Sequence, residues 1–142
     1  MRSGIVVLST LAAFSIAAVP AAAQIHFDVE LQPAAPTVDD VVVAHVVAED
    51  GDTLCFPDPM FSPVVRDGDS VELTFTFTDA CDPNFVGPAW DYPLGMFDVG
   101  SWRFDLQVCY SNPPPLPSYC EIDVESTFDV GPDDRIFDAG FE

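Results

Sequence analysis

Residues 64–78 read VVRDGDSVELTFTFT, and this stretch indicates the fold class. After the Asp67-Gly68 pair, apolar residues alternate with polar ones, which is the two-residue period of a strand buried on one face. Asp-Gly between apolar segments is typical of a tight hairpin turn, because glycine adopts a positive φ at little cost. We therefore expect a β-hairpin around this pair.

Similar strand patterns recur along the chain, and no segment shows a helical period. The last two strands are separated by prolines, which lack amide donors and cannot sit inside a sheet, so we expect a second hairpin with a proline-stiffened tip. About seven short strands at this spacing are typical of a β-sandwich. The expected strands cover residues 25–32, 41–48, 53–56, the two arms of the hairpin around 67–68, 89–94, 102–110 and 119–130.

The charge of the chain is strongly one-sided. Its 142 residues include 24 acidic side chains and four arginines, with no lysine, for a formal charge of −20. Such a surface repels phosphate backbones and anionic lipids, so we expect no nucleic-acid partner. The length suits one domain, and an apolar content of 49% provides a core.

The first 23 residues have the layout of a secretory signal peptide. Arg2 precedes the uncharged residues 5–19, Pro20 follows, and residues 21–23 are alanines, which suit signal peptidase. The apolar run is shorter than the roughly 20 residues that a membrane-spanning helix needs, although an uncleaved anchor is the alternative. We expect cleavage before Gln24 and a mature protein that is secreted or periplasmic, with no membrane insertion.

Because we expect the protein to be exported, we expect its cysteines to have a structural role. An even number of them in an oxidising compartment predicts disulfide bonds. Zinc sites usually show close pairs such as C-x-x-C, whereas these four are separated by wide gaps. The cysteines are Cys55, Cys81, Cys109 and Cys120.

Four cysteines allow three pairings, and the two hairpins favour one of them. Residues 55 and 81 are nearly equidistant from the first turn, and residues 109 and 120 flank the proline-rich tip. The second bridge needs a β-bulge near the tip, because Cys109 has solvent-face parity and Cys120 shares the parity of Ile122, which we expect to face inward. A link from Cys109 to Cys55 or Cys81 would instead join the two sheets.

Three features together suggest a family. They are residues 33–43, in which a proline-rich turn joins two strands, the Asp67-Gly68 hairpin, and the sequence LGMFDVGSW at 94–102. The last is similar to the Leu-x-Gly-x-Tyr segment that precedes the penultimate strand of immunoglobulin-like sandwiches, with Trp102 where tyrosine is usual. The chain from Ile25 to Val130 thus resembles a bacterial secreted immunoglobulin-like or fibronectin III-like domain.

The resemblance implies a fold and a domain plan, but no function. It implies an all-β chain with a single immunoglobulin-like antiparallel β-sandwich of about seven strands at residues 24–130. From the residues themselves we expect the signal peptide at 1–23 before this domain, and a short flexible tail at 131–142, which begins with the linker-like sequence Gly-Pro-Asp-Asp. Unlike antibody-type domains, the chain does not bracket a core tryptophan with its cysteines.

We expect no catalysis and no cofactor. A hydrolase needs a nucleophile, a base and a group that orients the base, yet His26 and His45 are the only imidazoles and no serine lies in a Gly-x-Ser-x-Gly motif. His26 has the parity of solvent-facing residues and His45 lies in an apolar strand, so we interpret both as structural.

Two metals are alternatives. Copper would require an amino terminus at His26, for which the residue before the cut, Ile25, is unsuitable. Calcium would require loop carboxylates, which do not match the twelve-residue Asp-x-Asp-x-Asp-Gly pattern. We therefore expect no metal and interpret these acids as a solvated surface. The loop acids are Asp50, Asp52, Asp58, Asp67 and Asp69.

Aromatic loops are the best candidates for binding, because exposed apolar residues at one end of a sandwich can form a recognition patch. Trp90 and Tyr92 have an alternative role as a cap on the core. We expect a non-catalytic module that recognises a protein or a glycan, or that serves a structural role. The alternatives are a small secreted inhibitor of a basic enzyme and a copper- or calcium-binding sandwich protein. The candidate patch is Phe56, Met60, Phe61, Phe85, Trp90 and Tyr92.

Overall fold

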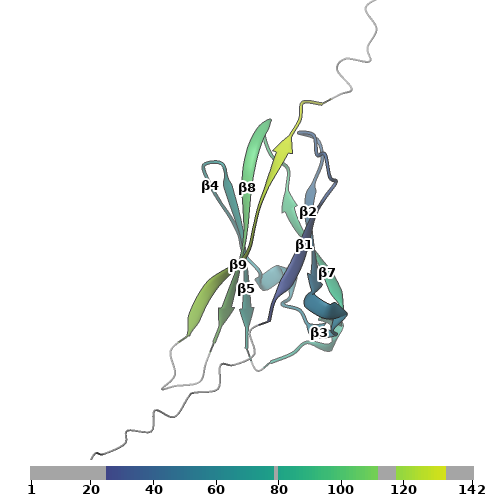
Figure 1. The fold of residues 1–142 in the computed structure, drawn as a ribbon, viewed down its shortest axis with the longest axis vertical. Coiled ribbons are helices and arrows are strands. Elements are labelled where there is room, and N and C mark those ends of the chain that lie inside the picture. The colour runs from purple at the N-terminus through teal and green to yellow at the C-terminus, as the bar shows by residue number, and fades with distance from the viewer. Residues whose placement is uncertain (1–24, 79, 112–117, 134–142) are drawn as a thin grey trace, which may run out of the picture.

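The computed structural model describes residues 25–78, 80–111 and 118–133. The expected signal peptide and residues 134–142 of the expected tail lie outside this part of the chain. The described residues form strands joined by loops and three short 3-10 turns (Figure 1), so the expectation of an all-β chain is confirmed. In the same residues, no helix has the length and apolar character needed to cross a membrane.

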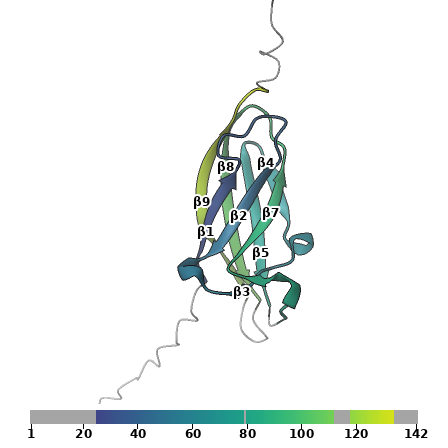
Figure 2. The same cartoon turned by 90° about the vertical axis from the view of Figure 1, so that its right-hand side faces the viewer.

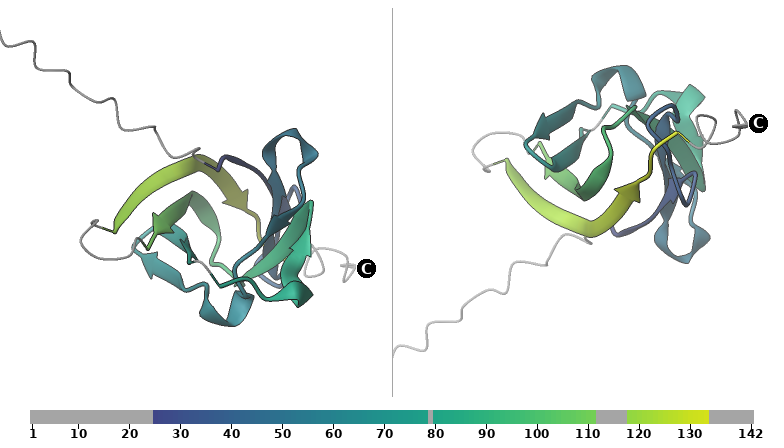
Figure 3. Two further views of the ribbon diagram at one scale, coloured as in Figure 1. Left: turned by 90° about the horizontal axis from the view of Figure 1, so that it is seen from below. Right: turned by 90° about the horizontal axis from the view of Figure 1, so that it is seen from above.

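The longer strands build two sheets that face each other across a common interior (Figures 1 and 3). This two-layer arrangement fits the predicted β-sandwich. The first sheet contains, in spatial order, β1 (Phe27–Gln32), β2 (Val42–Ala48) and β7 (Ala89–Gly95). The second contains β4 (Val64–Asp67), β5 (Ser70–Phe77), β8 (Gly100–Tyr110) and β9 (Tyr119–Val130).

Several short elements lie outside the two sheets. A two-stranded ladder joins β3 to β6, and it lies among the 3-10 turns. These elements are β3 (Leu54–Cys55), β6 (Val86–Gly87), η1 (Glu49–Gly51), η2 (Pro59–Phe61) and η3 (Pro83–Phe85).

The β4–β5 hairpin forms as predicted, but its turn lies one residue later. The last pair of the ladder is Asp67 with Ser70, so Gly68 and Asp69 occupy the turn. Gly68 has a φ of +60°, which suits the first position of a two-residue hairpin turn. This register places the alternating apolar residues of β5 on the inner face.

The prediction of a wholly antiparallel fold is wrong for one pair of strands. β5 runs parallel to β8, from Ser70 beside Arg103 to Phe77 beside Tyr110. A parallel pair needs a long crossover, and the chain between β5 and β8 supplies it by passing through the first sheet as β7. The two strands are in phase, so their apolar residues form one continuous inner wall.

The core lies between the inner faces of the two sheets. Residues 42–48, which carry apolar side chains at both parities, alternate in the structure between buried and half-buried, with Val42 and Val46 fully buried, whereas Val41 is exposed. From the other strands, Phe27, Phe75 and Tyr92 meet in the interior, and the rings of Phe75 and Tyr92 lie 4.6 Å apart. Close aromatic packing of this kind stabilises a core beyond its buried area.

Both expected disulfides are present. Cys55 at the end of β3 pairs with Cys81 after β5, with their Cα atoms 5.8 Å apart. Cys109 and Cys120 lie directly opposite each other in the β8–β9 ladder and are also bonded. The sequence spacing thus predicts the connectivity.

The bulge that the second bridge requires lies in β9. Leu106 pairs with Val124 and Gln107 with Ile122, so Asp123 is the extra residue. The bulge turns Ile122 outward, where it is 41% exposed. The expectation that Ile122 faces inward is therefore wrong, because parity reverses at a bulge.

The extra residue joins the two layers along one edge. Asp123 accepts a hydrogen bond from the Phe27 amide at 2.8 Å, and its other oxygen lies 2.7 Å from Nδ1 of His26. Further along this edge, the amide of Val38 donates to the carbonyl of Gly131. These contacts fix β1 to β9.

Arg66 joins the layers along the opposite edge. From β4 its guanidinium donates to the carbonyls of Leu94 and Met96, at 2.9 and 2.7 Å, and it lies 3.9 Å from the ring centre of Phe97. Gly95 allows this approach, because a Cβ there would stand 2.6 Å from Nη2 of Arg66. The two edges are thus closed by different polar contacts.

Candidate functional site

A short turn between β3 and β4 displays two large apolar side chains to solvent. We call residues 57–62 the display turn; it contains η2, which stands out from the side of the molecule (Figure 2). Met60 is 86% exposed and Phe61 is 77% exposed. Large apolar residues exposed side by side are informative when the backbone that carries them is ordered.

The backbone of the display turn is held by a set of local hydrogen bonds. Asp58 caps η2, because its carboxylate accepts from the amide of Met60 at 2.8 Å. The carbonyl of Asp58 accepts from the amide of Phe61 and from the hydroxyl of Ser62, whose residue is buried. Hydrogen bonds among its own residues therefore fix the backbone of the turn.

Tyr92 anchors the display turn to the core. This residue is buried in β7, and its hydroxyl donates to the carbonyl of Pro57 at 2.7 Å. Burial, with a smaller effect of the charge on Asp58, raises the pKa of Tyr92 well above its ordinary value. The hydroxyl consequently stays protonated and remains a donor.

A hollow of about 590 Å³ lies beside the display turn. Its walls include Phe56, Phe61 and Phe77, together with the disulfide between Cys55 and Cys81. Phe56 directly follows β3 and Phe77 ends β5, so the small β3–β6 ladder and the four-stranded sheet both contribute to it. A hollow of this size with apolar walls is typical of a ligand or partner site.

The ionisable groups at the hollow are both acidic. Asp58 and Asp82 line it, and no basic residue is among the described residues that do so. Asp82 caps η3, since its Oδ1 accepts from the backbone amide and the side-chain amide of Asn84. The hollow thus combines aromatic walls with a negatively charged rim.

The six predicted patch residues divide into three groups. Met60 and Phe61 are exposed together, as expected of a binding surface. Phe56 and Tyr92 are buried; Phe56 forms part of the wall of the hollow, and Tyr92 holds the display turn from the core. The remaining two lie half-buried with their rings 5.2 Å apart and do not line this hollow; they are Phe85 and Trp90.

Sequence reasoning missed several components of the hollow, including the rim residue Asp82, and two of the others share a signal. Phe77 reads as the last member of an alternating strand, and Cys81 reads only as a disulfide partner. Their shared signal is position, because both flank the end of β5, where the chain leaves the sheet. The disulfide brings that end against β3 and the display turn.

The histidines lie at separate places and contact different carboxylates. The hydrogen bond with Asp123 raises the pKa of His26 above its ordinary value. His45 lies in β2, with its Nδ1 2.6 Å from a carboxylate oxygen of Asp91 in β7, beside a smaller hollow of about 300 Å³. Among the described residues, the side chain that each imidazole contacts is a carboxylate.

The acids considered as calcium ligands are distributed over three loops. Asp50 and Asp52 lie at η1, Asp58 caps η2, and Asp67 and Asp69 lie at the β4–β5 turn. Within the part of the chain that the structure describes, no three His, Cys, Asp or Glu side chains are grouped so that they could hold a metal ion.

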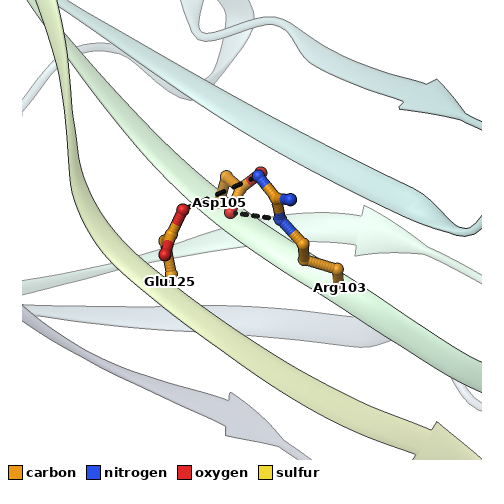
Figure 4. A network of polar contacts seen from close by, with 3 residues as sticks. All are labelled: Arg103, Asp105 and Glu125. Carbon is orange, nitrogen blue, oxygen red and sulfur yellow. Dashed lines mark hydrogen bonds and ion pairs between the residues drawn. The ribbon is translucent and has the colours of Figure 1, made fainter.

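The buried carboxylate of Asp105, on the four-stranded sheet, is paired with Arg103. Asp105 in β8 is nearly buried, and the guanidinium of Arg103 donates to both of its oxygens at 2.7–3.0 Å (Figure 4). Glu125 lies 3.6 Å from the same guanidinium. The hydrogen bond to Asp105 raises the pKa of Arg103, and the cluster is a paired structural network.

Comparisons with known proteins add no relative. No family model matches the sequence, and neither a curated protein nor a solved structure was found to match it. The geometry of the display turn and its hollow therefore carries the functional argument.

Proposed function

We propose that this protein is an exported, non-catalytic binding module that recognises a partner through the display turn and the adjacent hollow. The observation that carries the proposal is the exposure of Met60 and Phe61 on a turn that several hydrogen bonds hold in place. Two independent anchors, the Tyr92 hydroxyl and the Cys55–Cys81 disulfide, hold this turn and its hollow in place.

The free energy that burial of these two exposed side chains would contribute supports a role in binding. Burying a Met or Phe side chain contributes roughly 1.5–3 kcal/mol, and the fold leaves this free energy unused at two consecutive positions. A turn that is already ordered loses little conformational entropy when it binds, so more of that free energy is available for affinity. Aromatic anchors beside a pocket are typical of the residues that dominate binding at interfaces.

The compartment and the fold family belong to the same proposal. Two disulfides fit an oxidising environment outside the cytoplasm, as the expected signal peptide also indicates. The β1–β2–β7 sheet and the β8–β9 hairpin support a relationship to immunoglobulin-like domains, whereas the parallel β5–β8 pair is a departure from them. We propose a variant of that sandwich.

The test compares two double variants. M60S/F61S removes the displayed side chains, and M96S/V99S removes two exposed apolar side chains from the β7–β8 loop as a matched control. Wild type and both variants are screened against glycan arrays and purified extracellular proteins. We expect a ligand whose binding weakens at least about tenfold, or 1.4 kcal/mol, in M60S/F61S alone.

Two results would oppose the proposal. One is that no ligand distinguishes M60S/F61S from wild type, and the other is that M96S/V99S weakens binding equally. If the ligand is an enzyme, its activity in the presence of each variant tests the inhibitor alternative directly.

A further inference from the structure

We infer that the partner is a protein and that the segment seated in the hollow is cationic, with an arginine or lysine next to an apolar anchor. This inference rests on the proposed function and specifies its partner. It comes from three properties of the site, which are the charge of its rim, the absence of a compensating cation among the described residues, and the character of its walls.

The rim carries two carboxylates, each of which accepts hydrogen bonds from the described residues through only one of its two oxygens. Asp58 accepts the Met60 amide through Oδ1, and Asp82 accepts both nitrogens of Asn84 through Oδ1. In each carboxylate, Oδ2 receives no hydrogen bond from the described part of the chain. A cationic donor that enters the hollow can therefore reach an available oxygen on either side.

The two described arginines are both bound elsewhere. Arg66 is held by the carbonyls after β7, and Arg103 by the buried carboxylate of Asp105. Neither lines the hollow. The negative charge of the rim is thus not compensated from within the described residues, and a bound cation is the partner that would balance it.

The walls suit the whole side chain of a cationic residue. An arginine or lysine stem is apolar and packs against Phe56 and Phe77, while the charged head extends to the rim. An arginine head also stacks on phenylalanine faces. At long range, a chain of charge −20 attracts basic partners and repels acidic ones, which accelerates association with the former.

The test is a selection from a random peptide library displayed on phage. The protein is produced as the full chain with its export segment, purified from outside the cytoplasm, and used at physiological ionic strength. D58N/D82N neutralises the rim and keeps both caps, because the asparagine side-chain oxygen also accepts the capping hydrogen bond. D28N/E30Q removes the same number of charges from β1, which does not line the hollow.

Peptides that lose binding in M60S/F61S are the informative set. We expect them to be rich in arginine and lysine beside aromatic or aliphatic residues, to weaken about tenfold in D58N/D82N, and to bind D28N/E30Q like wild type. Their binding should also weaken as salt rises.

The opposing outcomes separate the inference from the proposed function. If the informative peptides are neutral, or bind D58N/D82N as tightly as wild type, the display turn still binds a partner and the cationic inference is wrong. If basic peptides bind equally to M60S/F61S, or lose as much affinity in D28N/E30Q, the interaction is a general charge effect and the inference fails. If no peptide depends on Met60 and Phe61, the inference of a cationic protein segment is contradicted, and the proposed function is contradicted as well only if the glycan arrays and purified proteins also give no ligand that depends on these two residues.

Discussion

Replacing Arg66 with methionine keeps most of the aliphatic stem and removes the guanidinium that joins β4 to the end of β7. The variant loses two hydrogen bonds from a charged donor, to the carbonyls of Leu94 and Met96, and the contact over Phe97. Such hydrogen bonds contribute about 1.5–3 kcal/mol each, and an exposed cation–π contact contributes about 0.5–1 kcal/mol. Because water reaches this edge, we expect a loss of about 2–3 kcal/mol in the free energy of unfolding.

Gly95→Ala provides an independent way to break the same contact. The added Cβ would stand 2.6 Å from Nη2 of Arg66, so the guanidinium must leave, and the φ of +100° adds backbone strain. Gly100→Ala is the matched control, because Gly100 also has a positive φ but has no atom within 4 Å of the added Cβ. We expect Gly95→Ala to destabilise the protein by about 2 kcal/mol more than Gly100→Ala.

A double-mutant cycle measures the shared contact. Once methionine replaces Arg66, the alanine at position 95 has no guanidinium to displace and costs only its backbone strain. The double variant should therefore be about 2 kcal/mol more stable than the sum of the single losses predicts. Urea unfolding followed by circular dichroism gives each value. If the two losses simply add, Arg66 does not hold this edge and the reasoning fails.

Two other predictions concern ion pairs. Because Asp123 raises the pKa of His26 above 6.5, protonated His26 contributes stability that is complete below pH 6.5 and is lost as pH rises through the raised pKa. The melting temperature of wild type relative to His26→Gln should fall over that range, and parallel pH profiles of the two proteins would contradict this. Arg103→Met leaves the buried Asp105 carboxylate unpaired and should cost about 2 kcal/mol, but less in an Asp105→Asn background. Urea titrations of the four proteins test this coupling, and an equal cost in both backgrounds would refute it.

The strands and bridges were predictable because their signals are local. The alternation in 64–78 follows from the two-residue period of a strand, and it depends on no distant residue. The weak strands expected at 53–56 and 89–94 correspond to β3 at Leu54–Cys55 and β7 at Ala89–Gly95. The Cys109–Cys120 bridge followed from a hairpin, because antiparallel arms bring residues on either side of a turn together. The Cys55–Cys81 pairing was predicted correctly, but not for the expected reason, because the ladder of the first hairpin ends at Val64 and Leu73 and Cys55 lies in β3.

The neighbour of β5 was not predictable in the same way. Periodicity states which face of a strand is buried, but it does not state which strand lies beside it. Val71 and Phe75 face inward whether β5 pairs antiparallel or parallel with its neighbour. The choice depends on how the chain between β5 and β8 crosses to the other sheet, and this is a property of the whole fold.

For the candidate patch, too, sequence alone did not state which single residues are buried and which are exposed. Phe56 and Phe61 both lie in a proline-rich loop, yet one is buried and the other is exposed. The difference arises from a distant contact, because the amide of Phe56 donates to the carbonyl of Phe85 and draws Phe56 into the interior. Composition indicated a group of candidate aromatic residues, but contacts such as the β3–β6 ladder decide which of them are exposed.

The bulge at Asp123 was predictable in part, because the sequence indicated that a bulge exists but not which residue is the extra one. Its existence was required by sequence, because Cys109 and Cys120 have conflicting parity and can be bridged only if the ladder contains an extra residue. Its position within β9 then has a second consequence, since the extra residue is released from the ladder and its carboxylate reaches His26 and Phe27. One irregularity therefore allows the disulfide and closes the edge of the fold. The conflicting parity of the two cysteines thus indicates from sequence that the ladder contains an extra residue, and the structure shows that this residue contacts a strand outside its own sheet.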